Sequence, residues 1–70
     1  MNRTSVNSSN IRSIGYEGMI LEIEFHNNTV YQYFHIPEII YKNLMAATDS
    51  HGQYFDEHIK KSKYPYVRIK

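Results

Sequence analysis

Residues 21–33 have the sequence Leu-Glu-Ile-Glu-Phe-His-Asn-Asn-Thr-Val-Tyr-Gln-Tyr. Apolar and polar side chains alternate on both sides of the Asn27-Asn28 pair, and this period of two predicts a β-hairpin. Two registers are open at the turn. If the two asparagines form a two-residue turn, Tyr31 and Tyr33 lie with the glutamates on the polar face.

In the second register the loop spans residues 26–28, with Asn28 in a left-handed conformation beside a bulge. Ile23 then faces Tyr31, and the tyrosines join the apolar face, because a slip of one residue moves every side chain to the other face. We prefer this register, since it separates the apolar side chains from the polar ones. Three apolar residues nevertheless fall on the polar face: Ile20, Val30 and Phe34.

The residues before this hairpin extend the sheet. Residues 10–20 show the same alternation, and Glu17-Gly18 is the predicted turn, because glycine adopts a positive φ at little cost. This turn pairs Tyr16 with Met19. The predicted apolar face comprises Ile14, Tyr16, Met19, Leu21, Ile23, Phe25, Tyr31 and Tyr33, and the predicted polar face comprises Ser13, Glu22, Glu24 and Gln32.

A helix is predicted after the third strand. It begins at Pro37, because proline suits the first helical position, and continues to residue 47. Ile40, Leu44 and Ala47 recur at the spacing of one helical face, which is expected to pack on the apolar face of the sheet.

The rest of the chain predicts one more helix and one extended segment. Residues 50–53 have the Ser-x-x-Gln pattern of a capping box, and a short helix follows over residues 54–61 with Phe55 and Ile59 as its apolar anchors. Residues 64–69 alternate again, but a proline among them confines the segment to an edge strand or an extended tail.

These elements predict a single α+β domain over residues 1–70. It consists of a three-stranded antiparallel meander, a packed helix, a second short helix and a short extended C-terminal segment, and residues 1–9 are predicted to form a flexible N-terminus. A chain of 70 residues sustains one core. The absence of cysteine excludes a disulfide framework and favours a reducing, cytoplasmic location. No apolar run is long enough for a membrane span.

No catalytic centre, metal site or cofactor is predicted, so we do not expect an enzyme. The four histidines include no pair at the helical spacing of metalloprotease motifs, and no thiolate ligand is available. Ser8-Ser9 lacks the surrounding motif of a serine nucleophile. Imidazole and carboxylate side chains are concentrated in one stretch, which comprises Asp49, His51, Asp56, Glu57 and His58.

Charge is distributed unevenly along the chain, although the formal net charge is only +1. All seven acidic residues precede residue 58, whereas five of the eight lysine and arginine residues follow it. A basic end of this kind can contact a polyanion. The alternative explanation is a solvated terminus whose cations lie near the C-terminal end of a helix, where positive charge is favourable.

Five spaced motifs cover nearly the whole chain: Val6-x-Ser8-Ser9-x-Ile11-x-x-Ile14-Gly15-Tyr16, Leu21-x-Ile23-x-Phe25, Tyr31-x-Tyr33, Ile36-Pro37-x-x-x-Tyr41-x-x-Leu44 and Gly52-x-Tyr54-Phe55. Together they resemble the KTSC domain, a family named for its occurrence at the C-terminus of some lysyl-tRNA synthetases. Its other members are mostly stand-alone bacterial or phage proteins of unknown function. The resemblance implies a suggested role in binding RNA. Members often have glycine where this chain has Asn28, which agrees with a left-handed residue there.

Two groups of residues are candidates for nucleic-acid contact. Tyr31 and Tyr33, two apart on one strand, can each stack on an unpaired base, or both can pack under the first helix. The second group interleaves aromatic and cationic side chains: Tyr64, Tyr66, Lys60, Lys61, Lys63 and Arg68. RNA or another single-stranded nucleic acid is therefore one candidate partner. The alternative is a protein-interaction or homodimerisation module without a nucleic-acid role, in which the apolar residues of the polar sheet face meet a partner.

Overall fold

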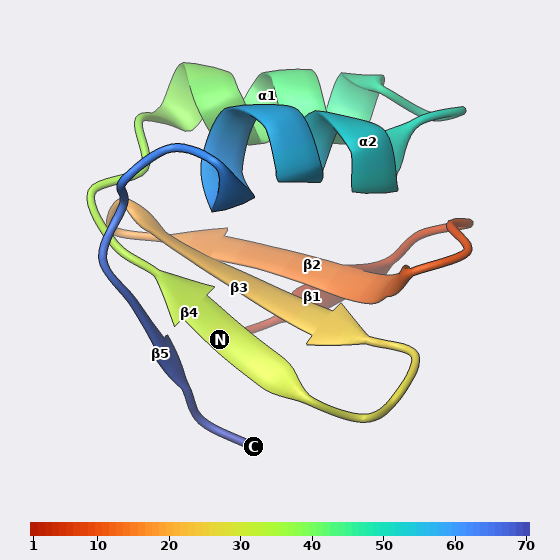
Figure 1. The fold of residues 1–70 in the computed structure, drawn as a ribbon, viewed down its shortest axis with the longest axis horizontal. Helices are drawn as coiled ribbons and strands as arrows, with labels where there is room; N and C mark the ends of the chain where they lie inside the picture. Colours follow the sequence, from red (N-terminus) through yellow and green to blue (C-terminus); the bar gives the residue numbers. More distant parts are fainter.

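The computed structural model describes residues 1–70 as one antiparallel sheet with helices on one of its faces (Figure 1). The strands are β1 (Arg3–Ser5), β2 (Ile11–Glu17), β3 (Ile20–Phe25), β4 (Val30–Tyr33) and β5 (Tyr66–Arg68), and the sheet order equals the chain order. The helices are α1 (Glu38–Ala46) and α2 (His51–Phe55), and a π-helical segment, η1 (Asp56–Lys60), continues α2. The α+β class and the meander followed by helices are confirmed.

The second hairpin has the preferred register. Leu21 pairs with Tyr33 and Ile23 with Tyr31, and Asn28 has a φ of 70°. Asparagine tolerates this left-handed conformation better than most residues do. Both tyrosines of β4 therefore lie on the face that the helices cover.

The first hairpin differs from its prediction. Its turn consists of Gly18 and Met19, with φ values of 56° and 64°, and not of Glu17 and Gly18. Tyr16 accordingly pairs with Leu21, and Met19 is an exposed turn residue and not a member of the apolar face. A two-residue turn with two positive φ values matches the twist of the flanking strands, which explains why a methionine is left-handed here. Because the register moves by two residues, the faces of β3 are as predicted.

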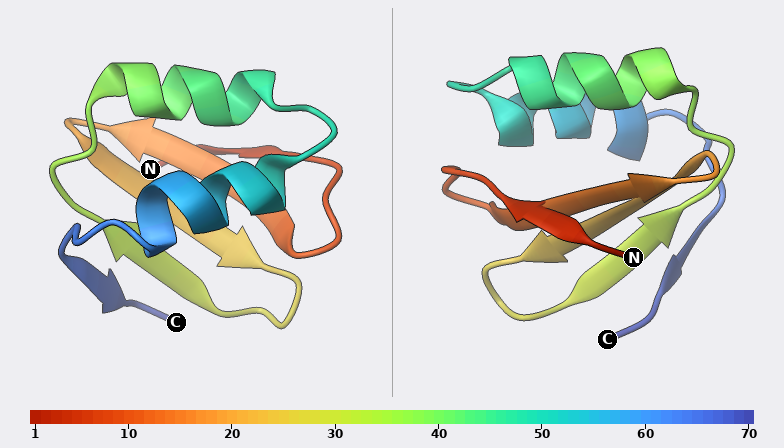
Figure 2. Two further views of the ribbon diagram at one scale, coloured as in Figure 1. Left: turned by 45° about the horizontal axis from the view of Figure 1, so that its top comes forward. Right: turned by 180° about the vertical axis from the view of Figure 1, so that it is seen from behind.

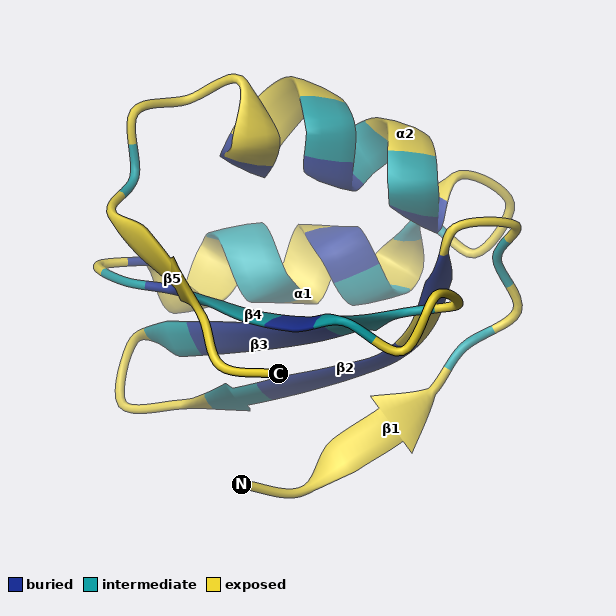
Figure 3. Cartoon of the chain, turned by 60° about the horizontal axis from the view of Figure 1, so that its bottom comes forward, coloured by how far each residue is buried: buried dark blue, intermediate teal, exposed yellow.

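The N-terminal residues contain a strand that their sequence does not reveal. Residues 1–9 lack apolar alternation, yet Arg3–Ser5 forms edge strand β1, antiparallel to β2. All three of its residues are exposed (Figure 3). Gly15 of β2 lets this strand approach, because a Cβ at that position would lie 2.8 Å from the backbone oxygen of Asn2.

The sheet face away from the helices carries a polar network. Arg3 pairs with Glu22, which also accepts a hydrogen bond of 2.8 Å from Gln32. Ser13 accepts from Arg3 and donates to Glu24 at 2.8 Å. Residues of β1, β2, β3 and β4 are therefore joined by side chains as well as by backbone pairing.

We expect the stability of the fold to fall with acid through Glu22. Burial alone would raise the pKa of the Glu22 carboxyl, but hydrogen bonds from Gln32 and Arg3 and the positive charge of Arg3 together hold that pKa below its ordinary value. Since the folded-state pKa is lower than the unfolded one, the stabilisation is present above about pH 4.3 and is lost as pH falls through the folded-state pKa. Urea midpoints at pH 7 and pH 3 should differ less for Glu22→Gln than for the unmodified protein. Glu17→Gln, at an exposed position, is the matched control, and an unchanged pH dependence in Glu22→Gln would contradict the assignment.

The core lies between the sheet and the helices (Figure 2). The helices pack on the strands through buried apolar side chains, as predicted. These are Leu44 of α1, Phe55 of α2 and Ile59 of η1. Pro37 is the cap that precedes α1 and not its first helical residue. Ser50 occupies the predicted capping position of α2 without making a side-chain capping bond. The nine core residues are Ile11, Ile14, Leu21, Ile23, Tyr33, Ile36, Leu44, Phe55 and Ile59.

The C-terminal segment is an edge strand, one of the two predicted possibilities. Tyr66–Arg68 pairs antiparallel with β4, placing Tyr66 opposite Tyr33, and Pro65 directly precedes the strand. The two strands nearest the chain ends thus form the two edges of the sheet (Figure 2). Neither helix of the structure has the length and apolar character that a membrane crossing requires.

Candidate functional site

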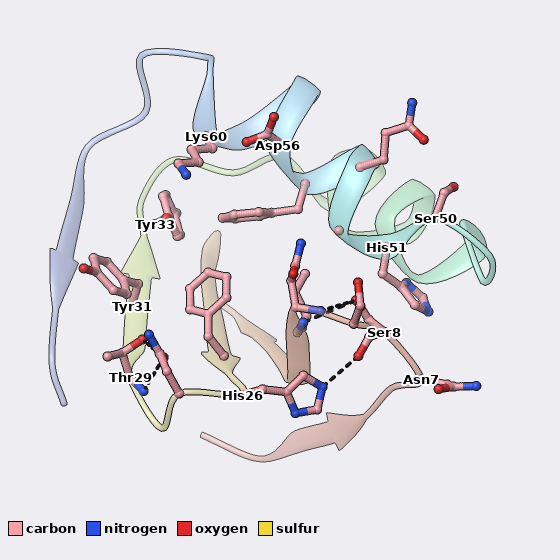
Figure 4. Close-up of a pocket in the computed structure, with 18 of the residues that line it drawn as sticks. Asn7, Ser8, His26, Thr29, Tyr31, Tyr33, Ser50, His51, Asp56 and Lys60 are labelled. Atoms are coloured by element: carbon pink, nitrogen blue, oxygen red, sulfur yellow. Dashed lines mark hydrogen bonds between the residues drawn. The ribbon is translucent and has the colours of Figure 1, made fainter.

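A broad, open groove lies between α2, the β3–β4 loop and the edge formed by β4 and β5 (Figure 4). Residues of the loop before β2 complete its wall. Its volume of about 1480 Å³ exceeds the range of about 300–1,000 Å³ that is usual for small-molecule pockets. The groove therefore suits an extended ligand better than an enclosed small one.

Aromatic side chains from three elements form one end of the groove, which we call the aromatic end. Tyr31 and Tyr33 of β4 lie beside Tyr66 of β5, with ring-centroid distances of 6.1 and 5.6 Å. Phe55 of α2 packs edge-on against Tyr33 at 5.3 Å. Tyr33 is only 6% exposed, Tyr31 is half-buried and Tyr66 is 65% exposed. The cluster therefore extends from the buried ring of Tyr33 to the exposed ring of Tyr66 at the rim of the groove.

The two tyrosines of β4 differ in burial, and only one of them belongs to the core. Tyr33 is a core residue, but its covering partner is Phe55 of α2 and not the first helix. Tyr16 is instead the tyrosine that stacks on α1, through Tyr41 at 4.7 Å. Tyr31, in contrast, has a partly open ring that lines the groove.

The Tyr33 hydroxyl is held in its protonated form. Burial, with the neighbouring Tyr31 and Tyr66 hydroxyls, raises the pKa of Tyr33 to about 12. The group can therefore act as a hydrogen-bond donor over the whole physiological pH range.

Two of the four predicted cationic residues line the groove at this end. Lys60 ends η1, and Arg68 of β5 pairs opposite Tyr31. Asp49 and Asp56 also line the groove, so its lysine, arginine and aspartate charges balance. Positive charge is thus confined to the aromatic end and is modest.

The other predicted contact residues lie outside the groove. Lys61 is close to Asp56, with 3.6 Å between Nζ and Oδ2. Lys63 is exposed, and Tyr64 packs against the core. The structure therefore brings together Tyr31, Tyr33, Tyr66, Lys60 and Arg68 and leaves Lys61, Lys63 and Tyr64 apart.

The opposite end of the groove is polar and was not predicted as a site. We call it the polar end and define it by Ser8, Asn10, His51 and Gly52. A Cβ at Gly52 would lie 3.6 Å from Ser8 Oγ and 3.3 Å from Asn10 Nδ2, so the loop before β2 closely approaches the start of α2. The one sequence signal was the concentration of imidazole and carboxylate side chains around His51.

Three further hydrogen bonds fix the loops that line the groove. The backbone oxygen of Ser8 lies 2.7 Å from Nε2 of His26. Asn27 Oδ1 accepts hydrogen bonds from the backbone N–H and the hydroxyl of Thr29.

The carboxylates and imidazoles of the chain form no group of three that could hold a metal ion.

Comparison with known proteins places the chain in a family. Residues 7–64 match the KTSC domain. An uncharacterised protein of Stutzerimonas stutzeri (strain A1501) is 39% identical over 99% of both chains. A crystal structure of a KTSC domain protein from Yersinia pestis superimposes with a TM-score of 0.90 and 41% identity, over 99% of this chain and 97% of that one. The sequence match and the shared fold agree, and this chain belongs to the KTSC domain family.

Proposed function

We propose that this domain binds a short single-stranded segment of nucleic acid, RNA in particular, in the groove, and that its function is binding and not catalysis. The observation that carries the proposal is the aromatic end, where the open ring of Tyr66 and the half-buried ring of Tyr31 line the groove together with Lys60 and Arg68. Aromatic rings beside cations are the combination by which proteins bind single strands without reading their sequence.

The two rings and the two cations have separate roles. A base stacked on the rim formed by Tyr31 and Tyr66 gains about 1–3 kcal/mol. Its flanking phosphates then lie within reach of Lys60 and Arg68, which share that end of the groove. With about two phosphates neutralised, the logarithm of the affinity should fall with the logarithm of salt concentration at a slope of about −1.4.

A fluorescence titration with a labelled single-stranded RNA of about ten nucleotides tests this proposal. We expect binding at low salt that weakens about sevenfold between 50 and 200 mM salt, as that slope requires. The double variant Lys60→Ala/Arg68→Ala should remove most of the salt dependence. Lys42→Ala/Lys63→Ala is the matched control, because it removes the same charge at exposed positions outside the groove. The absence of binding at roughly 100 μM protein at the lower salt concentration would overturn the proposal, since salt-sensitive binding should be strongest there.

The alternative function, a protein-interaction or homodimerisation module, has one supporting observation. Val67 and Ile69 are exposed apolar side chains at the C-terminal edge of the sheet. The residues first expected to meet a partner are less available, because Val30 is 2% exposed and Ile20 and Phe34 are half-buried. Light scattering would support this alternative if it showed a dimer that Val67→Ala/Ile69→Ala converts to a monomer.

A further inference from the structure

The imidazole of His51 is buried, but one of its nitrogens is accessible. His51 is only 5% exposed, and its Nδ1 lies 2.8 Å from the backbone oxygen of Leu44. A carbonyl oxygen can only accept, so Nδ1 carries the hydrogen, and in the neutral ring Nε2 carries a lone pair. Nε2 has no hydrogen-bond partner in the protein. Every side-chain nitrogen or oxygen that is fully buried does have such a partner, so Nε2 is not among the fully buried atoms. Nε2 is therefore accessible, and the residue lines the polar end of the groove (Figure 4).

Hydrogen-bond donors lie at the same end. Ser8 Oγ is 3.3 Å from the backbone nitrogens of both Asn10 and Ile11 and accepts from them, which leaves its own hydrogen free to donate. The side-chain amide of Asn10 approaches Gly52, the residue that follows His51. One buried acceptor and two donors therefore line the same end of the groove, where the loop before β2 packs closely against Gly52.

We infer that the polar end is a subsite for a ribose 2′-hydroxyl, in which Nε2 of His51 accepts a hydrogen bond from the hydroxyl and Ser8 or Asn10 donates one to it. A hydroxyl group is both a donor and an acceptor, and it complements this set of groups in both directions. The 2′-hydroxyl is also the group by which a protein distinguishes RNA from DNA at a given site. The inference rests on the proposed function and specifies RNA as its ligand.

A phosphate group does not fit the polar end. Phosphate oxygens only accept, and they would face the lone pair of Nε2. Asp49 lines the same groove and adds a negative charge. The cationic residues Lys60 and Arg68, which suit a phosphate, belong to the aromatic end. The ends of the groove therefore differ in the part of a nucleotide that each can bind.

The test compares ligands that differ only at the 2′ position. Labelled RNA, DNA and 2′-fluoro RNA decamers of one sequence are titrated into the unmodified protein. The 2′-fluoro strand keeps an RNA-like sugar conformation but has no hydroxyl hydrogen. We expect RNA to bind about 2- to 10-fold more tightly than either of the other strands, which is the size of one or two hydrogen bonds.

The variant His51→Asn separates this contact from the structural role of the residue. The asparagine side-chain amide can still donate to the Leu44 carbonyl, but it has no group at the position of Nε2. Its affinity for RNA should fall to that for DNA, while its affinity for DNA stays unchanged. His58→Asn, at an exposed histidine outside the groove, is the control and should retain the preference for RNA.

Each outcome of the experiment decides one statement. If no strand binds, the proposed function fails. If RNA, DNA and 2′-fluoro RNA bind equally to the unmodified protein, the hydroxyl subsite is wrong while nucleic-acid binding stands. A preference for RNA that His51→Asn retains shows that another residue reads the hydroxyl and also overturns the assignment. If His51→Asn does not fold, the comparison of the three strands on the unmodified protein still decides whether a 2′-hydroxyl is recognised.

Discussion

Replacing Phe55 by alanine is expected to lower the free energy of unfolding by about 3–5 kcal/mol. Phe55 is almost fully buried and packs edge-on against Phe25 at 5.7 Å and against Tyr33 at 5.3 Å. Its removal takes away the ring that joins α2 to β3 and β4 and leaves a cavity between them. A domain of this size has a total stability of about 3.5–10 kcal/mol. The variant should therefore be largely unfolded at moderate urea concentrations.

Urea denaturation followed by circular dichroism measures this loss. Ile39→Ala is the matched control, because Ile39 is a large apolar residue of α1 that is 59% exposed. Substitutions at such surface positions usually change stability by less than about 0.5 kcal/mol. A loss below about 1 kcal/mol for Phe55→Ala would show that α2 is held on the sheet by other contacts, such as that of Ile59.

Replacing Tyr66 by alanine is expected to weaken RNA binding by about 5- to 150-fold, the equivalent of the 1–3 kcal/mol that stacking one base contributes. Tyr66 provides the most exposed ring of the aromatic end and adjoins both Tyr31 and Tyr33. Since this ring is at the rim of the groove, its loss should affect binding more than folding. The measurement is the same fluorescence titration at low salt.

Two further variants distinguish stacking from a loosened β5 strand. Tyr66→Phe keeps the ring and should keep most of the affinity. Ile69→Ala shortens another exposed side chain of the C-terminal segment, outside the groove, and should bind as the unmodified protein does. If Tyr66→Ala binds RNA with unchanged affinity and unchanged thermal stability, the aromatic end is not where the bases stack.

The sequence predicted the strand register best where the burial of apolar side chains and the local backbone conformation required the same register. The register of the β3–β4 hairpin followed from two requirements, an apolar face that includes Tyr31 and Tyr33 and a left-handed Asn28. The turn at Gly18-Met19 was missed because an apolar methionine was placed on a strand, whereas the twist of the hairpin requires positive φ at both turn positions.

Elements that depend on distant contacts were harder to predict. Strand β1 has no periodicity of its own, and it is held by pairing with β2 and by the ion pair between Arg3 and Glu22. The polar end of the groove likewise joins Ser8 to His51, from segments far apart in the chain. Aromatic and cationic residues could be found by composition, but a lone accessible imidazole nitrogen depends on the contact with Leu44 that occupies the other nitrogen.

The order of the strands has a consequence for the speed and sequence of folding. β1, β2 and β3 each pair with the next strand through a short connection, so most of the sheet forms by local loop closure, which is fast. The pairing of β4 with β5 instead closes a long loop that contains both helices, and its entropic cost is greater. We expect β5 to dock last. The ring of Tyr66 would then join those of Tyr31 and Tyr33 only in the final step, so a nascent chain could not present the complete aromatic end before β5 had been synthesised.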